Sequence, residues 1–116
     1  MQMKIRIKEQ FIRFRLTKTD VTKLAEDGMV TEHAQFVTRM LIYSIVRTNG
    51  HRLSIDFDGK AIILGMPGEM IDELSTTEIV GFSENNTQVK ILVEKDFICM
   101  ENPLEGQSDN YDYPNS

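Results

Sequence analysis

Apolar and charged residues alternate at the start of the chain. Every second position of residues 3–7 and of residues 12–16 is apolar, and Lys or Arg stands between these positions. A period of two is typical of a strand with one buried face. We expect a hairpin with a two-residue turn at Glu9-Gln10, since a slip of one residue would mix the two faces. The expected pairs are Ile7–Ile12, Ile5–Phe14, Arg6–Arg13 and Lys4–Arg15.

Two segments have the spacing of short amphipathic helices. In the first, Thr17 or Thr19 can cap the helix, Asp20 lies in the first turn where the dipole favours an anion, and Gly28 ends it. The second opens at Pro67, because proline is tolerated at the first helical position, and runs through Ser75. Each segment carries one apolar stripe, so both helices are expected to pack on a sheet.

The remaining apolar runs predict strands. Residues 29–37 indicate a weak strand, residues 39–66 a meander and residues 77–97 a last hairpin. The turn signals are Asn49-Gly50, Asp58-Gly59 and Asn85-Asn86. The expected facing pairs are Val46–Leu53 and Ile42–Phe57 across the first turn, and Phe82–Val89 and Val80–Ile91 across the last. No internal repeat is evident.

These elements predict an α+β fold. We expect an antiparallel sheet of about seven or eight strands with two short helices, and a sheet of this size can stay open or curl into a barrel. The length of 116 residues fits one domain. Residues 1–101 are expected to form it. Residues 102–116 are polar, acidic and prolyl, and are expected to form a flexible tail.

Composition excludes several classes of protein. No apolar run approaches the roughly 18 residues of a membrane-spanning helix, and the alternating start lacks the apolar stretch of a secretory signal. The single cysteine, Cys99, excludes an internal disulfide framework. This cysteine and the two histidines, His33 and His51, supply too few ligands for a usual zinc site of Cys and His. We therefore expect a cytoplasmic protein.

Charge is spread unevenly along a chain whose formal net charge is −5. Most charged residues in 1–18 are Lys or Arg, whereas all charged residues in 96–116 are Asp or Glu. In the predicted hairpin, five cations share one face, and each opposed pair costs some tenths to about 1 kcal/mol. A phosphate-bearing ligand, an acidic neighbouring strand such as the one with Glu94 and Asp96, the acidic tail or solvent screening could compensate. These cations are Lys4, Arg6, Lys8, Arg13 and Arg15.

Catalytic signatures are scarce. Glu94 and Asp96 stand two residues apart on one predicted strand, and paired carboxylates of this kind can hold Mg²⁺. Asp56 and Asp58 have the same spacing, although an Asp-Gly turn explains Asp58 structurally. Cys99 has no histidine near it in sequence, and the chain has no Gly-rich phosphate loop. The negative net charge and the lack of interleaved aromatic residues disfavour nucleic acid. The oligomeric state stays open.

Several segments resemble a family of small uncharacterised bacterial proteins, a domain of unknown function. These are Met3 to Thr17, Leu92 to Phe97, Cys99 and the Asp-rich end with Pro114-Asn115. The resemblance transfers no activity. A much weaker similarity is to the triphosphate-tunnel proteins, barrels whose inward charged face binds triphosphates and Mg²⁺. Where that superfamily carries Glu-x-Glu-x-Lys, this chain reads Lys4-Ile5-Arg6-Ile7-Lys8.

The leading hypothesis is a small binding domain without enzymatic activity. Its basic hairpin face would take a phosphate-bearing small molecule or an acidic protein segment. The first alternative is a Mg²⁺-dependent phosphohydrolase of the tunnel type, with Glu94 and Asp96 as metal ligands. The second is a protein–protein interaction module whose acidic tail, with Tyr111 and Tyr113, engages the basic face.

Overall fold

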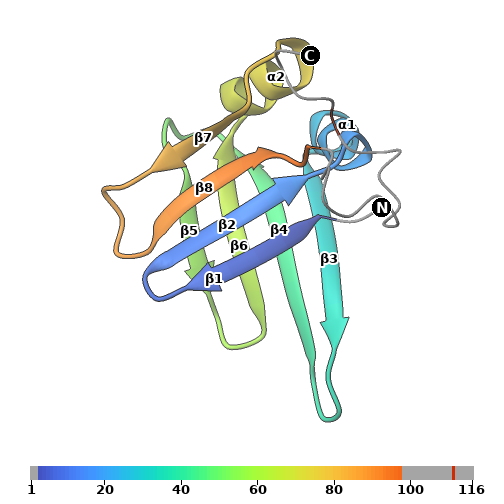
Figure 1. Ribbon diagram of the computed structural model, residues 1–116, viewed down its shortest axis with the longest axis vertical. Coiled ribbons are helices and arrows are strands. Elements are labelled where there is room, and N and C mark those ends of the chain that lie inside the picture. The colour runs from blue at the N-terminus through green and yellow to red at the C-terminus, as the bar shows by residue number, and fades with distance from the viewer. Residues whose placement is uncertain (1–2, 98–110, 112–116) are drawn as a thin grey trace.

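The computed structural model describes residues 3–97 and 111. In it, eight strands form two stacked sheets, and two helices lie at one end of these sheets (Figure 1). The elements are β1 (Lys4–Lys8), β2 (Phe11–Leu16), α1 (Lys18–Asp27), β3 (Met29–Gln35), β4 (Met40–Thr48), β5 (Ser54–Phe57), β6 (Ala61–Pro67), α2 (Gly68–Thr76), β7 (Gly81–Glu84) and β8 (Lys90–Lys95). The α+β class is thus confirmed.

The sheets are mixed and open, so the expectation of one antiparallel sheet is wrong. The first sheet has the order β1-β2-β8-β7 and the second the order β3-β4-β6-β5. In each, the two central strands run parallel and the outer strands pair antiparallel. In the second sheet, β6 runs parallel to β4 because β5 carries the chain back between them and then takes the outer edge. In the first sheet, β2 and β8 are joined through α1, the whole second sheet and α2, and parallel strands require such a long connection.

The Asn49-Gly50 turn does not close a hairpin, which corrects the predicted meander. Val46 lies opposite Gly65 and Ile42 opposite Ala61, because β4 pairs with β6 instead of β5. The strand β6 is the more apolar partner, and parallel strands in a sheet centre are typically apolar. The shorter, more exposed β5 takes the edge.

Hairpins do form at the three remaining predicted turns. The register of β1 with β2 is the predicted one, and Glu9 takes a positive φ of 53° at its turn. The Asp58-Gly59 turn joins β5 to β6 as expected. In the last hairpin, the predicted register is wrong, because residues 85–89 separate the strands instead of a two-residue turn. Its pairs are Phe82–Val93 and Glu84–Ile91.

Both helices begin and end near the predicted residues. Thr17 caps α1 in a capping box in which the Asp20 carboxylate accepts the backbone N–H of Thr17 at 2.9 Å. Gly28 ends α1 in the left-handed conformation, with φ of 76°. Pro67 precedes α2 as its N-cap residue. Neither described helix is long and apolar enough to cross a membrane.

The Asp58 side chain stabilises the turn between β5 and β6 in a pH-dependent way. Its carboxylate accepts the backbone N–H groups of Lys60 and Ala61, each at 2.8 Å, and these bonds lower the pKa of Asp58 below 3.8. A lowered pKa means that the stabilisation is present above pH 3.8 and is lost as the pH falls through the folded-state value. We expect Asp58→Ala to lower the melting temperature at neutral pH, and the gap to wild type to shrink below pH 3.8. A gap that does not change with pH would contradict this role of the carboxylate.

The fold contains an internal repeat that the sequence did not reveal. Each half has the order strand, strand, helix, strand, strand, and exchanging the halves exchanges the two sheets. Buried residues fifty positions apart occupy equivalent places: Met3 and Leu53, Ile12 and Ile62, Phe14 and Leu64, Leu16 and Met66, Val21 and Ile71, and Leu24 and Leu74. Few of these pairs are identical residues, so the repeat is one of burial and register.

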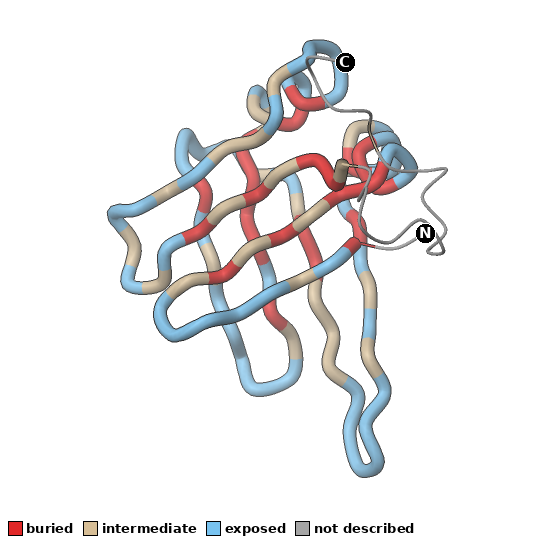
Figure 2. Tube along the Cα trace, viewed as in Figure 1, coloured by how far each residue is buried: buried red, intermediate tan, exposed pale blue. Residues whose placement is uncertain are grey.

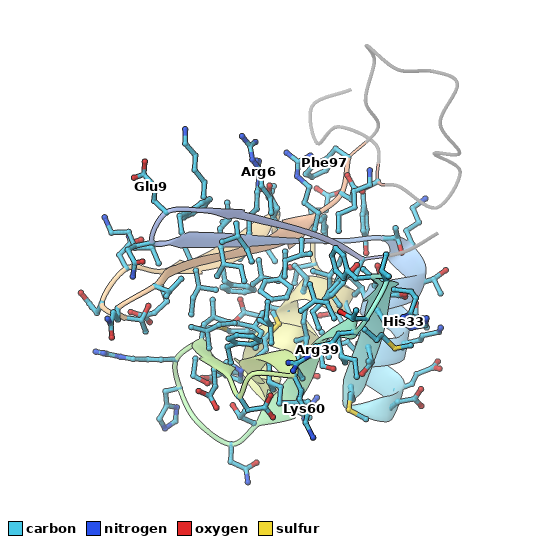
Figure 3. The ribbon with its side chains drawn as sticks, turned by 90° about the horizontal axis from the view of Figure 1, so that it is seen from below. Arg6, Glu9, His33, Arg39, Lys60 and Phe97 are labelled. Carbon is cyan, nitrogen blue, oxygen red and sulfur yellow. The ribbon has the colours of Figure 1, made fainter. Side chains whose placement is uncertain are left out.

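The core lies between the sheets and under the helices. Figure 2 shows the buried positions of β2 and β8 on strands that cross those of β4 and β6, and Figure 3 shows side chains filling the space between the two layers. The helices pack on each other at one end of the sheets (Figure 1). Residues 3–97 place no helix at the opposite end.

Candidate functional site

The five predicted cations share the outer face of the first sheet, which we call the basic face. Because Ile12, Phe14 and Leu16 are buried against the second sheet, the residues between them point outward. In Figure 3, Arg6 projects away from the second sheet. The pairs Arg6–Arg13 and Lys4–Arg15 stand opposite each other, as the hairpin register requires. The face comprises Lys4, Arg6, Lys8, Arg13 and Arg15.

Two carboxylates at the end of the neighbouring strand β8 neutralise part of the basic face. The parallel pairing of β2 with β8 puts Glu94 opposite Arg15. Its Oε1 accepts from Arg13 Nε at 2.7 Å and lies 3.4 Å from Arg15 Nε. Asp96, directly after β8, lies 3.2 Å from Lys4 Nζ. One of the four expected compensations, an acidic neighbouring strand, is therefore present.

Arg6 and Lys8 differ from the other three cations. In the described part of the chain, no carboxylate lies within 4.0 Å of either side chain. Both are exposed on the edge strand β1. A shallow cavity of about 310 Å³ lies beside Arg6, lined by Lys4, Ile5, Arg6, Arg13 and Arg15. This cavity is the place on the basic face where an anion can meet several cations at once.

Glu94 and Asp96 do not form an open carboxylate pair. Each is engaged by cations of the basic face, and Asp96 is buried. Among the described residues, no cluster of three or more His, Cys, Asp or Glu side chains could hold a metal ion. Magnesium binding at this pair stays a prediction, and it would require the ion pairs to break.

The other candidate residues lie apart from the basic face. His33 is exposed on β3, and His51 is exposed beside Glu69, 3.6 Å away. Asp56 lies on β5 in the second sheet, away from Glu94. Cys99, Tyr113 and the rest of the predicted tail except Tyr111 lie outside the described residues.

Tyr111 is the described part of the tail, and it packs against the domain. Its N–H donates to the Asp96 carbonyl at 2.8 Å, and its ring lies 4.8 Å from Lys95 Nζ. Lys95 is buried and donates to the Thr77 carbonyl at 3.0 Å, and desolvation lowers its pKa. Tyr111 therefore contacts the end of β8, beside the basic face.

A second hollow, which sequence reasoning missed, lies between the sheets, and we call it the intersheet cleft. Its volume is about 690 Å³, and it opens where Ile7 and Phe57 are 56% and 61% exposed. These two residues are equivalent in the repeat. The sequence feature that could have revealed the cleft is the alternation of apolar residues, which continues to Ile7 at the end of β1 and to Phe57 at the end of β5. The lining residues are Ile7, Glu9, Ile12, Leu41, Ser54, Ile55, Asp56, Phe57, Ile62, Thr87, Gln88 and Val89.

The described chain is thus an α+β domain of two open mixed sheets, with a basic outer face and an apolar cleft between the layers. It belongs to a family of unknown function, DUF7009, whose sequence profile matches residues 3–115. The resemblance expected from the sequence is confirmed at this level. Comparison with curated proteins and with solved structures gave no match.

Proposed function

We propose that the protein is a cytoplasmic binding domain without enzymatic activity that holds a phosphate-bearing small molecule on its basic face. The observation that carries the proposal is the cavity beside Arg6, which is lined by four cationic side chains; among the described residues, Glu94 is the carboxylate that bridges two of them. Guanidinium groups match phosphate oxygens through paired N–H donors. A polyphosphate can contact several of these groups together.

Electrostatics favours an anion at this place. Arg6 and Arg13 stand opposite each other, and like charges on facing residues destabilise a strand pair. Glu94 relieves Arg13 and Arg15, but it lies on the far side of β2 from Arg6. A bound phosphate on the β1 side would relieve the remaining repulsion. The whole chain is acidic, so the basic face is a local concentration of charge that the net charge hides.

Replacing Arg6 tests the proposal with the least damage to the fold. Arg6 is exposed and forms no ion pair with a carboxylate of the described residues, whereas removing Arg13 would break its ion pair with Glu94. A hydrogen bond to a charged group contributes about 1.5–3 kcal/mol, so Arg6→Gln should weaken tripolyphosphate binding roughly 10- to 100-fold. Isothermal titration calorimetry at two salt concentrations measures the change. The matched control is Lys60→Gln, which removes a cation from the turn of the second sheet (Figure 3).

Three outcomes would overturn the proposal. The first is the absence of heat with phosphate, pyrophosphate and tripolyphosphate. The second is binding that Arg6→Gln and Lys60→Gln weaken equally, which would mean that the basic face is not the site. The third is Mg²⁺-dependent release of phosphate, which would favour the phosphohydrolase with Glu94 and Asp96 as ligands. Binding of acidic peptides but not of polyphosphates would instead favour a protein partner.

A further inference from the structure

The internal repeat reveals a projection that the fold itself does not require. Glu32–Tyr43 in β3 and β4 is equivalent to Glu84–Ile91 in β7 and β8, because Tyr43 pairs with Ile62 and Ile91 with Ile12. The β7–β8 ladder ends there. The β3–β4 ladder continues through three more pairs, namely His33–Ile42, Ala34–Leu41 and Gln35–Met40. Figure 1 shows this hairpin projecting beyond the other strands, on the side away from the helices.

The end of this hairpin is apolar and exposed, and we call residues 36–40 the hairpin tip. Phe36 is 59% exposed and Val37 is 102% exposed. The equivalent turn between β7 and β8 is polar, with Asn85 and Asn86. Arg39 is exposed beside the apolar residues, and no carboxylate among the described residues lies within ion-pair distance of it. Exposure of these apolar side chains to water is unfavourable, so the composition of the tip indicates that it binds a partner.

The intersheet cleft has the opposite shape and the opposite charge. Its floor is apolar, with Ile12 and Ile62 from the two central strands. Two carboxylates, Glu9 and Asp56, belong to its lining, and no Lys, Arg or His does so among the described lining residues. The strands that carry Ile7 and Phe57, β1 and β5, both end away from the helices, and β5 runs toward the side on which the hairpin projects (Figure 1). One molecule therefore carries both an apolar projection with a cation and an apolar hollow with anions.

We propose that the hairpin tip of one copy docks into the intersheet cleft of a second copy. Phe36 and Val37 would enter between the sheets, and Arg39 would meet Glu9 or Asp56. In Figure 3, Arg39 and Glu9 lie on different layers of the molecule, which fits a contact between molecules better than one within it. This proposal is independent of the proposed function, because the cleft and the basic face share no lining residue.

A second copy explains more of the surface than a small molecule does. A small apolar ligand would fill the cleft but would leave Phe36 and Val37 in water. A reciprocal dimer covers two tips and two clefts with one two-fold arrangement, the commonest symmetry of soluble oligomers. It also pairs the cation of each tip with the carboxylates of the opposite cleft.

The test measures association of the full chain by sedimentation equilibrium. Wild type is expected to form a dimer whose population rises with concentration. Val37→Glu in the tip and Phe57→Glu in the cleft should each raise the dissociation constant at least tenfold, because each places a carboxylate in the contact. Met29→Glu is the matched control, since Met29 is an exposed apolar residue at the other end of β3. Circular dichroism verifies that all variants fold.

Mixing the two variants separates docking from a general loss of apolar surface. Val37→Glu retains an intact cleft and Phe57→Glu retains an intact tip, so a mixture can form one of the two contacts. We expect the mixture to associate more tightly than either variant alone. A monomeric wild type would overturn the proposal. A dimer that Met29→Glu weakens as much as Val37→Glu, or a monomer that carries a small apolar molecule released by Phe57→Glu, would also overturn it.

Discussion

Replacing Phe14 with alanine is expected to lower the free energy of unfolding by about 3–5 kcal/mol, the usual cost of truncating a buried aromatic residue. Phe14 is completely buried on the central strand β2, and its neighbours across the sheet are Ile5 on β1 and Val93 on β8. Its side chain points toward the second sheet. The substitution would leave a hollow between the two layers, where neighbouring strands cannot collapse without changing their register.

Phe11 is the matched control for this experiment. It lies on the same strand, three residues away, but on the outer side with the basic face, and it is only partly buried. We expect Phe11→Ala to cost less than half as much as Phe14→Ala, because less apolar surface is lost. Urea unfolding at constant m-value measures both changes. Equal losses in the two variants would mean that β2 does not bury the Phe14 face.

Local structure could be predicted from the sequence because neighbouring residues determine it. The register of β1 with β2 follows from the alternation of Ile and Arg, since any slip of one residue puts charge into the core. The start of α1 follows from Thr17 and Asp20, which satisfy each other's backbone groups. The turn at Asp58 follows from a side chain that accepts two nearby N–H groups.

The pairing of distant strands could not be predicted in the same way. Asn49-Gly50 has the strongest local hairpin signal in the chain, yet β4 leaves it and pairs with β6. The decisive term is burial of both strands at the centre of a sheet, and this term depends on residues far apart in sequence. The crossing between sheets through each helix has no local signature. The internal repeat could not be predicted for the same reason, because equivalent positions such as Phe14 and Leu64 are both buried but are different residue types.

The candidate site shows the same division. The cations of the basic face were found because they alternate on two adjacent strands. Glu94 was identified as their neighbour by charge alone, and the parallel pairing of β8 with β2 explains why it reaches Arg13 and Arg15. The intersheet cleft was missed because its walls come from opposite sheets. Ile7 and Phe57 read as ordinary core positions until the structure showed where the strands end.

A methyl group at Gly81 is expected to destabilise the protein by about 1–3 kcal/mol or more, the range observed for overpacking. Gly81 is the first residue of β7 and lies opposite Glu94. A Cβ there would meet the carbonyl oxygen of Val93 and would lie 2.7 Å from the Cα of Glu94. Both are backbone atoms of a central strand, so neither can turn aside as a flexible side chain would.

The strain at Gly81 should also reach the basic face, since the displaced residue is Glu94 itself. A shift of β8 would lengthen the contacts of Glu94 with Arg13 and Arg15, so Gly81→Ala should change both the melting temperature and polyphosphate affinity. Gly50→Ala is the control, because a Cβ at Gly50 meets its nearest atom, Thr48 Oγ1, at an ordinary 3.7 Å. That substitution should be neutral or slightly stabilising, because alanine restricts the unfolded chain. Thermal unfolding in which the two variants behave alike would show that β7 is not held against β8 in this register, and the position of Glu94 would then need another cause.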